Sequence, residues 1–121
     1  MEGSADITLL LPEPPSTNRM WRNVVIGGAP RTLKAKPYRE WLDAAARVVA
    51  EQSHADRIEG GYRIRITAPK QRRDLGNNEK PINDLLQAAG VVRDDKACEV
   101  ITIRRDLARE LGHLLVELWA V

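Results

Sequence analysis

The chain has 121 residues, of which 43% are hydrophobic and 30% charged, and its formal net charge is +2. This length suits one domain spanning residues 1–121, and the composition is that of a globular protein, not of a disordered or fibrous one. The single cysteine excludes an intramolecular disulfide and suits a reducing compartment. The apolar run Ile7–Leu11 is too short for a membrane span or a secretory signal, so we expect a cytoplasmic protein with no membrane partner.

The first half of the chain predicts a strand, a long loop and a helix. Ile7–Leu11 is apolar and is followed by prolines, which is typical of a buried strand that stops there. The segment Ser16–Lys36 contains Gly27-Gly28 and Pro30 without a sustained hydrophobic period, which predicts a loop. From Pro37 to about Ser53, apolar residues recur at helical spacing, so we expect an amphipathic helix.

The second half predicts three strands and another helix. Alternating apolar and basic residues over Tyr62–Thr67 indicate a strand. A helix is expected from about Asn78 to Ala89, with Asn77 or Asn78 as its cap, and strands at Ala97–Arg105 and His113–Ala120. The order β-α-β-α-β-β predicts an α+β fold in which two helices pack on one four-stranded mixed sheet.

Basic residues gather in two places. Between positions 14 and 39 there are six basic residues and no acidic one: Arg19, Arg22, Arg31, Lys34, Lys36 and Arg39. A second group, Lys70, Arg72 and Arg73, directly precedes Asp74. Such groups can be ordinary solvent-exposed surface or can bind phosphate, with equal support. The acidic residues that follow in the sequence decide between these interpretations.

Carboxylates concentrate between positions 74 and 95, at Asp74, Glu79, Asp84, Asp94 and Asp95. Phosphodiester hydrolysis builds negative charge on phosphoryl oxygens, and Mg²⁺ held by one or two carboxylates offsets that charge and activates water. A nearby lysine such as Lys80 can stabilise the transition state, and flanking arginines can hold the DNA backbone. The alternative interpretation is a solvated surface of mixed charge.

Geometry constrains such a metal site. A helix of about 12 residues spans roughly 18 Å, so Asp74 and Asp95 would lie at opposite ends of the second helix. Both can reach one metal ion only if the Asp94-Asp95 turn folds back toward Asp74, or if a second subunit completes the site.

Four segments resemble the RusA-type Holliday-junction resolvases, in the same order and at similar spacing over nearly the whole chain: PPSTNRMWR, PYREW, RRDLGNNEK and AGVVRDDKACEV. The resemblance implies a homodimeric, Mg²⁺-dependent crossover junction endodeoxyribonuclease that acts on four-way DNA junctions in recombination and repair. By this resemblance Asp74 and Asp95 are catalytic metal ligands with Asp94 beside them, Lys80 lies near the phosphate, and Asn77 is the motif asparagine.

One departure from the family pattern matters. The family has Asp-x-Asp-Asn where this chain has Asp74-Leu75-Gly76-Asn77, so a carboxylate is missing. Either Glu79 or Asp84 supplies a replacement ligand, or the chain is a non-catalytic protein that binds branched DNA through a degenerate metal site. A general nucleic-acid-binding module without junction preference is a third possibility.

The remaining chemically distinctive residues carry simpler predictions. Trp21 either stacks on an unpaired base or anchors its segment to the core, with equal support. Trp41 and Trp119 follow apolar periodicities and are expected in the core. The histidines at 54 and 113 have no partner at metal-ligand spacing and are expected at the surface. Cys98 is expected to be a small buried residue.

Overall fold

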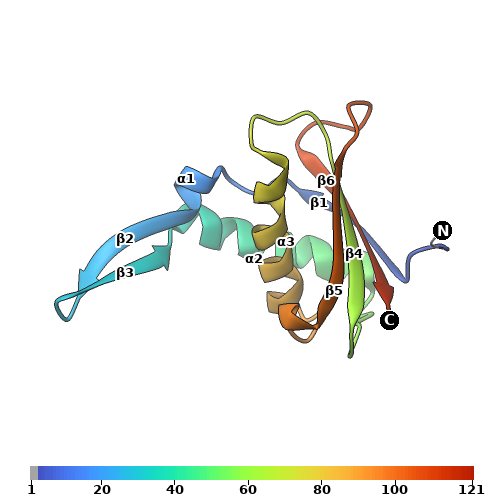
Figure 1. The fold of residues 1–121 in the computed structure, drawn as a ribbon, viewed down its shortest axis with the longest axis horizontal. Coiled ribbons are helices and arrows are strands. Elements are labelled where there is room, and N and C mark those ends of the chain that lie inside the picture. The colour runs from blue at the N-terminus through green and yellow to red at the C-terminus, as the bar shows by residue number, and fades with distance from the viewer. Residues whose placement is uncertain (1–2) are drawn as a thin grey trace.

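A computed structural model describes residues 3–121 and confirms the predicted α+β class, with an added two-stranded arm (Figure 1). Two short 3₁₀ turns, η1 (Leu75–Asn78) and η2 (Asp95–Ala97), flank the second long helix. The helices and strands are β1 (Ile7–Pro12), α1 (Thr17–Met20), β2 (Trp21–Ile26), β3 (Ala29–Lys34), α2 (Lys36–Ser53), β4 (Tyr62–Ala68), α3 (Glu79–Ala88), β5 (Cys98–Arg105) and β6 (His113–Ala120).

The main sheet has the strand order β1-β6-β4-β5, and α2 and α3 cover one of its faces (Figure 1). The chain returns along α3 between β4 and β5, so these two strands are parallel, whereas the other neighbours are antiparallel. Leu9, Val116 and Ile66 pair across three strands and are fully buried beneath the helices. On the opposite face, paired Arg65 and Glu117 form an ion pair at 2.9 Å. The period of two therefore separates a core face from a charged face.

The two edges of this sheet differ. At the β1 edge, the Gln52 side chain of α2 accepts from the Leu10 amide at 2.7 Å and donates to the Leu10 carbonyl at 2.8 Å. At the other edge, no strand among residues 3–121 pairs with the outer side of β5. Val100 and Ile101 on β5 are 48% and 41% exposed. The β1 edge is thus blocked by the Gln52 side chain, which makes the hydrogen bonds that a neighbouring strand would make, whereas the β5 edge remains open to pairing.

The loop prediction for Ser16–Lys36 is wrong. This segment forms α1 and then an antiparallel ribbon of β2 and β3, which projects from the body (Figure 1). Gly27 and Gly28 have φ angles of +58° and +79°, as a two-residue hairpin turn requires. Pro30 is tolerated because both strands of an isolated ribbon are edge strands. A Gly-Gly pair between two short strand-like runs was the overlooked signal.

Both tryptophans that were expected in the core are buried. Trp41 and Trp119 are 9% and 6% exposed, and their indole N–H groups donate to the carbonyls of Pro12 at 3.1 Å and Gly3 at 3.0 Å. Each ring thus satisfies its donor. Trp41 packs in the core, whereas Trp119 lies on the opposite face of the sheet, with the Arg65 guanidinium 5.3 Å from its ring centre. Within residues 3–121, no helix combines the length and the apolar character needed to cross a membrane.

Candidate active site

The predicted carboxylate ligands lie at opposite ends of α3 (Figure 1). Asp74 precedes η1, near the end of β4, whereas Asp94 and Asp95 lie in the turn before β5. The ten residues of α3 span roughly 15 Å. The turn that carries Asp94 and Asp95 does not fold back toward Asp74. Across residues 3–121, no three carboxylate, histidine or cysteine side chains group closely enough to hold a metal ion. One subunit therefore does not bring Asp74 and Asp95 together.

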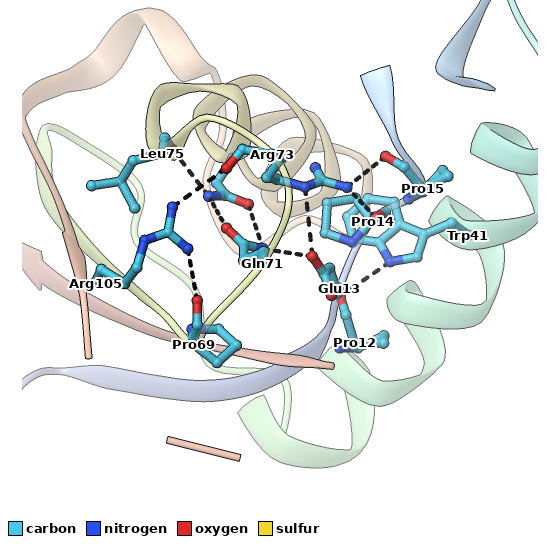
Figure 2. A network of polar contacts seen from close by, with 11 residues as sticks. Pro12, Glu13, Pro14, Pro15, Trp41, Pro69, Gln71, Arg73, Leu75 and Arg105 are labelled. Atoms are coloured by element: carbon cyan, nitrogen blue, oxygen red, sulfur yellow. Dashed lines mark hydrogen bonds and ion pairs between the residues drawn. The ribbon is translucent and has the colours of Figure 1, made fainter. Parts of the chain in front are cut away.

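The loop that carries Asp74 is fixed by Arg73, whose side chain is 7% exposed. Its guanidinium donates to the carbonyls of Pro14 and Pro15 and forms an ion pair with Glu13 at 3.6 Å (Figure 2). Burial lowers the pKa of Arg73, and Glu13 partly offsets this effect. Arg73 was predicted to hold a DNA phosphate, but in the structure it ties the segment after β1 to the Asp74 loop.

Amide side chains complete this support (Figure 2). Gln71 donates to Glu13 at 2.7 Å and accepts from the Asn78 amide at 2.8 Å. The Asn78 amide also donates to the Leu75 carbonyl at 3.0 Å, so this side chain braces the loop and makes no cap hydrogen bond to α3. Arg105 of β5 donates to the Pro69 carbonyl at 2.8 Å and anchors the loop to the end of the sheet.

The supported loop opens onto a hollow of about 570 Å³. Asp74 and Arg72 are exposed and line it from one side, and α1 lines the other side. Asn77 is exposed on the same wall, and Lys70 is exposed just before it in the chain. This surface combines two carboxylates, Glu13 and Asp74, with polar and cationic side chains, and Arg72 and Lys70 are its exposed cations.

A second hollow, of about 350 Å³, lies at the other end of α3. It is lined by Lys34 from the base of the arm, by Asp84 and Gln87 from α3, and by Asp95. The Asp95 amide donates to the Gln87 side-chain oxygen at 3.0 Å, which fixes the turn against the helix. Two carboxylates and a lysine from three distant parts of the sequence therefore share one cavity.

Asp94 and Asp95 have separate roles in this turn. The Asp94 carboxylate accepts from the Lys96 amide at 2.9 Å and caps η2, and this hydrogen bond lowers the pKa of Asp94. Asp95 is exposed and lines the hollow. Of the two, Asp95 is the side chain available to a ligand.

Asp84 is oriented by two partners. The buried Tyr38 hydroxyl donates to one carboxylate oxygen at 2.6 Å, and the Lys80 ammonium lies 3.5 Å from the other. Burial, and then the hydrogen bond to Asp84, raise the pKa of Tyr38, so this phenol stays protonated and remains a donor. Lys80 is 61% exposed and one helical turn from Asp84, so its ammonium can also reach a bound phosphate.

Glu79 belongs to a different hydrogen-bond network. Its carboxylate accepts from the Asn83 amide at 2.9 Å, and Asn83 accepts from the Tyr62 hydroxyl at 2.8 Å. Burial raises the pKa of Tyr62. At Gly76, where the family carboxylate is missing, no atom lies within 4 Å of the position a Cβ would take. The space for a side chain is therefore open, while Glu79 is engaged along α3.

Three of the predicted DNA-binding residues lie on the arm, and Lys34 at its base lines the hollow with Asp84 and Asp95. Arg22, Arg31 and Lys34 are exposed on the arm, and none of its residues is acidic. Arg19 is exposed on the preceding α1, and Lys36 on α2 lies 3.6 Å from Glu40. The base of the arm is closed by a hydrogen bond from the Ala35 amide to the Met20 carbonyl at 2.7 Å.

Trp21 anchors this arm. Its ring meets that of Tyr38 edge-on at 5.4 Å, with an interplanar angle of 63°. Of the two interpretations of Trp21, the structure supports the anchor. Tyr38 and Gln87 were not among the predicted site residues. Gln87 follows Asp84 by three residues and shares its helix face, whereas Tyr38 reaches Asp84 only through tertiary packing.

The chain matches no known protein-family model, and no curated protein matches it significantly.

Proposed function

We propose that the chain is a homodimeric, Mg²⁺-dependent endonuclease of the cytoplasm that hydrolyses phosphodiester bonds at four-way DNA junctions in recombination and repair. The observation that carries this proposal is the hollow that Lys34 of the basic arm lines together with Asp84 and Asp95. DNA held along the arm by Arg22 and Arg31 would lead its backbone to these carboxylates. The resemblance to the RusA-type resolvases supports the same activity.

The donor set suits magnesium. Mg²⁺ binds through one or two carboxylates, several waters and substrate phosphate oxygens, and does not need an all-protein cage. Asp95 is exposed, and Asp84 is held in one orientation by Tyr38. When bound, the ion would offset charge on the phosphate and lower the pKa of a bound water.

The chain's own cationic side chains would bind the phosphate and stabilise the charge that develops during hydrolysis. In hydrolysis a bond forms between water oxygen and phosphorus, a bond between phosphorus and a bridging oxygen breaks, and the leaving oxygen takes a proton. The Lys80 ammonium would stabilise charge on the phosphate, and Lys34 would hold the neighbouring backbone. Arg72 and Lys70, exposed at the other end of α3, would contact a second stretch of backbone.

A second subunit would bring Asp74 to Asp95. Asp95 lies at the start of β5, and Arg105 at its end donates to the Arg73 carbonyl at 3.4 Å, beside Asp74. In an antiparallel pairing of two β5 edges about a twofold axis, the start of one strand lies next to the end of the other. The partner subunit's Asp74 would thereby approach Asp95, and the open edge of β5 supports this arrangement.

Incubation of the purified protein with a synthetic four-way junction tests the proposal, with linear duplex of the same sequence as the control. We expect cleavage of the junction with Mg²⁺ and no cleavage with EDTA, while binding persists in EDTA because the arm supplies it. Cleavage that continues in EDTA would remove the metal mechanism. Tight junction binding without cleavage at any Mg²⁺ concentration would favour the alternative, a non-catalytic branched-DNA-binding protein, to which Gly76 points.

A further inference from the structure

The tip of the arm is apolar and exposed. Val25 and Ile26 precede the Gly27-Gly28 turn and are 73% and 54% exposed. Their cross-strand partners, Pro30 and Ala29, are also apolar. Aliphatic side chains this exposed, gathered at the end of a projecting element, mark a surface that meets a partner.

The stem below this tip is cationic. Arg22 pairs with Leu33 and Val24 with Arg31, so both arginines lie on the face of the ribbon that carries Ile26. Lys34 lies at the base of the opposite face, where Asn23 and Thr32 share a hydrogen bond at 3.1 Å. Six-residue strands extend roughly 20 Å, so the arm is long enough to follow a duplex groove.

We infer that the arm enters a groove of branched DNA and that Val25 and Ile26 insert between bases at the branch point, acting as a wedge. A two-stranded ribbon fits the major groove, and aliphatic wedges inserted between base steps are a recurring way in which proteins unstack DNA. A second copy of the chain is the less suitable occupant, because a stem with arginines and no acidic residue complements phosphates. The inference rests on the proposed function for the choice of branched DNA, but not on cleavage.

The experiment uses a four-way junction with 2-aminopurine at the branch point, whose fluorescence rises when the base unstacks. Full-length protein is added in EDTA, so that binding and unstacking are measured without cutting. The double variant Val25→Ser/Ile26→Ser is compared with wild type and with Val121→Ser, a control at a residue that is 68% exposed and remote from the arm (Figure 1). Circular dichroism checks folding, which we expect to be unchanged because the tip lies outside the core.

Wild type and Val121→Ser should raise the fluorescence severalfold, whereas the tip variant should lose most of this rise and keep its affinity within about fivefold. Arg22→Ser/Arg31→Ser should instead weaken binding and reduce the slope of log affinity against log salt by about 2. An undiminished rise with the tip variant, or no rise with wild type, overturns the inference. So does sedimentation that shows the tip variant as a monomer and wild type as a dimer, because the tip would then cover a second subunit. A protein that unstacks the junction but never cuts it would refute the proposed function alone.

Discussion

The Tyr38 hydroxyl donates a 2.6 Å hydrogen bond to the Asp84 carboxylate, and the same phenol ring packs against Trp21. One buried side chain therefore links the base of the arm to a candidate metal ligand on α3. Because the ring is fully buried, neither neighbour can shift without disturbing the packing between α2 and α3. The arm and the carboxylate are thus held in a fixed relation to one another.

Replacing Tyr38 by Phe tests this link. The change keeps the ring and removes the donor, so the partly buried Asp84 loses a hydrogen bond to a charged group. We expect the free energy of unfolding to fall by about 1.5–3 kcal/mol, measured by urea denaturation. Thr32→Val, which removes an exposed hydrogen bond on the arm, should change it by less than about 0.5 kcal/mol. Equal changes in the free energy of unfolding for the two variants would show that the Tyr38–Asp84 hydrogen bond stabilises the fold no more than an exposed one.

Mixed dimers test whether the site is shared between subunits. Asp74→Asn and Asp95→Asn homodimers should each lose about 100-fold or more in cleavage rate, because an absent ligand costs several kcal/mol of transition-state stabilisation. If Asp74 of one subunit acts with the partner's Asp95, a heterodimer of the two variants holds one intact site and one doubly altered site. Nicking of the junction should then return to about half of the wild-type rate per dimer.

A site built within each subunit from Asp84 and Asp95 gives a different outcome, because Asp74 would then be dispensable and the Asp74→Asn homodimer would cut at the wild-type rate. Refolding or subunit exchange of differently tagged variants supplies the heterodimer, and tandem purification isolates it. Junction binding by each homodimer in EDTA is the control, and it should be at least as tight as wild type because a negative charge is removed near DNA phosphates.

Gly76 is the position at which to restore the missing carboxylate. No atom lies within 4 Å of its Cβ direction, so Gly76→Asp should fold normally. If no other residue fully replaces the family carboxylate, this variant should reach half-maximal cleavage at about tenfold lower Mg²⁺, because an added ligand charge strengthens metal binding. Titration of the cleavage rate against Mg²⁺ measures the shift.

Glu79 is the competing candidate. If Glu79 already supplies the ligand, Glu79→Gln should need more Mg²⁺ than wild type, and Gly76→Asp should help only in the Glu79→Gln background. Asp84→Asn is the matched comparison, because Asp84 lies on a different face of α3 and lines the hollow with Asp95. If Asp84→Asn is inactive and Glu79→Gln cuts like wild type, Asp84 is the residue that replaces the carboxylate missing at Gly76. If wild type is inactive and Gly76→Asp alone creates cleavage, the natural chain is a non-catalytic junction-binding protein.

Cys98 should titrate above the usual range of a thiol. The residue is half-buried at the start of β5, and burial raises its pKa, so the neutral thiol is favoured in the folded state. Its contribution to stability is complete below the unfolded pKa and declines as pH rises through the folded pKa. The pH profile of alkylation by iodoacetamide should lie to the alkaline side of the profile in denaturant. Coincident profiles would contradict the predicted shift.

Much of the fold could be read from local pattern. The period of two at Tyr62–Thr67 and the helical spacing after Pro37 each specify which face is apolar, and both elements formed within a residue or two of their predicted bounds. The arm was missed because Pro30 argues against a strand, and only an isolated ribbon offers it an edge position. Asn78 takes the N-cap position of α3, one of the two predicted, but its side chain makes no cap hydrogen bond, because its Oδ1 accepts from the Gln71 amide at 3.3 Å.

The sequence by itself determined the inventory of the candidate site: carboxylates at 74 and 95, a lysine at 80, and a basic stretch without acids. It also determined the order of the elements, because periodicity and turn residues are local properties. Only the tertiary structure decided which of these groups meet. It separated Asp74 from Asp95 by the length of α3, joined Asp95 with Asp84 and Lys34, and buried Arg73 as a brace. Distances between elements depend on how the helices pack on the sheet, and that packing is set by the whole core, not by any single segment.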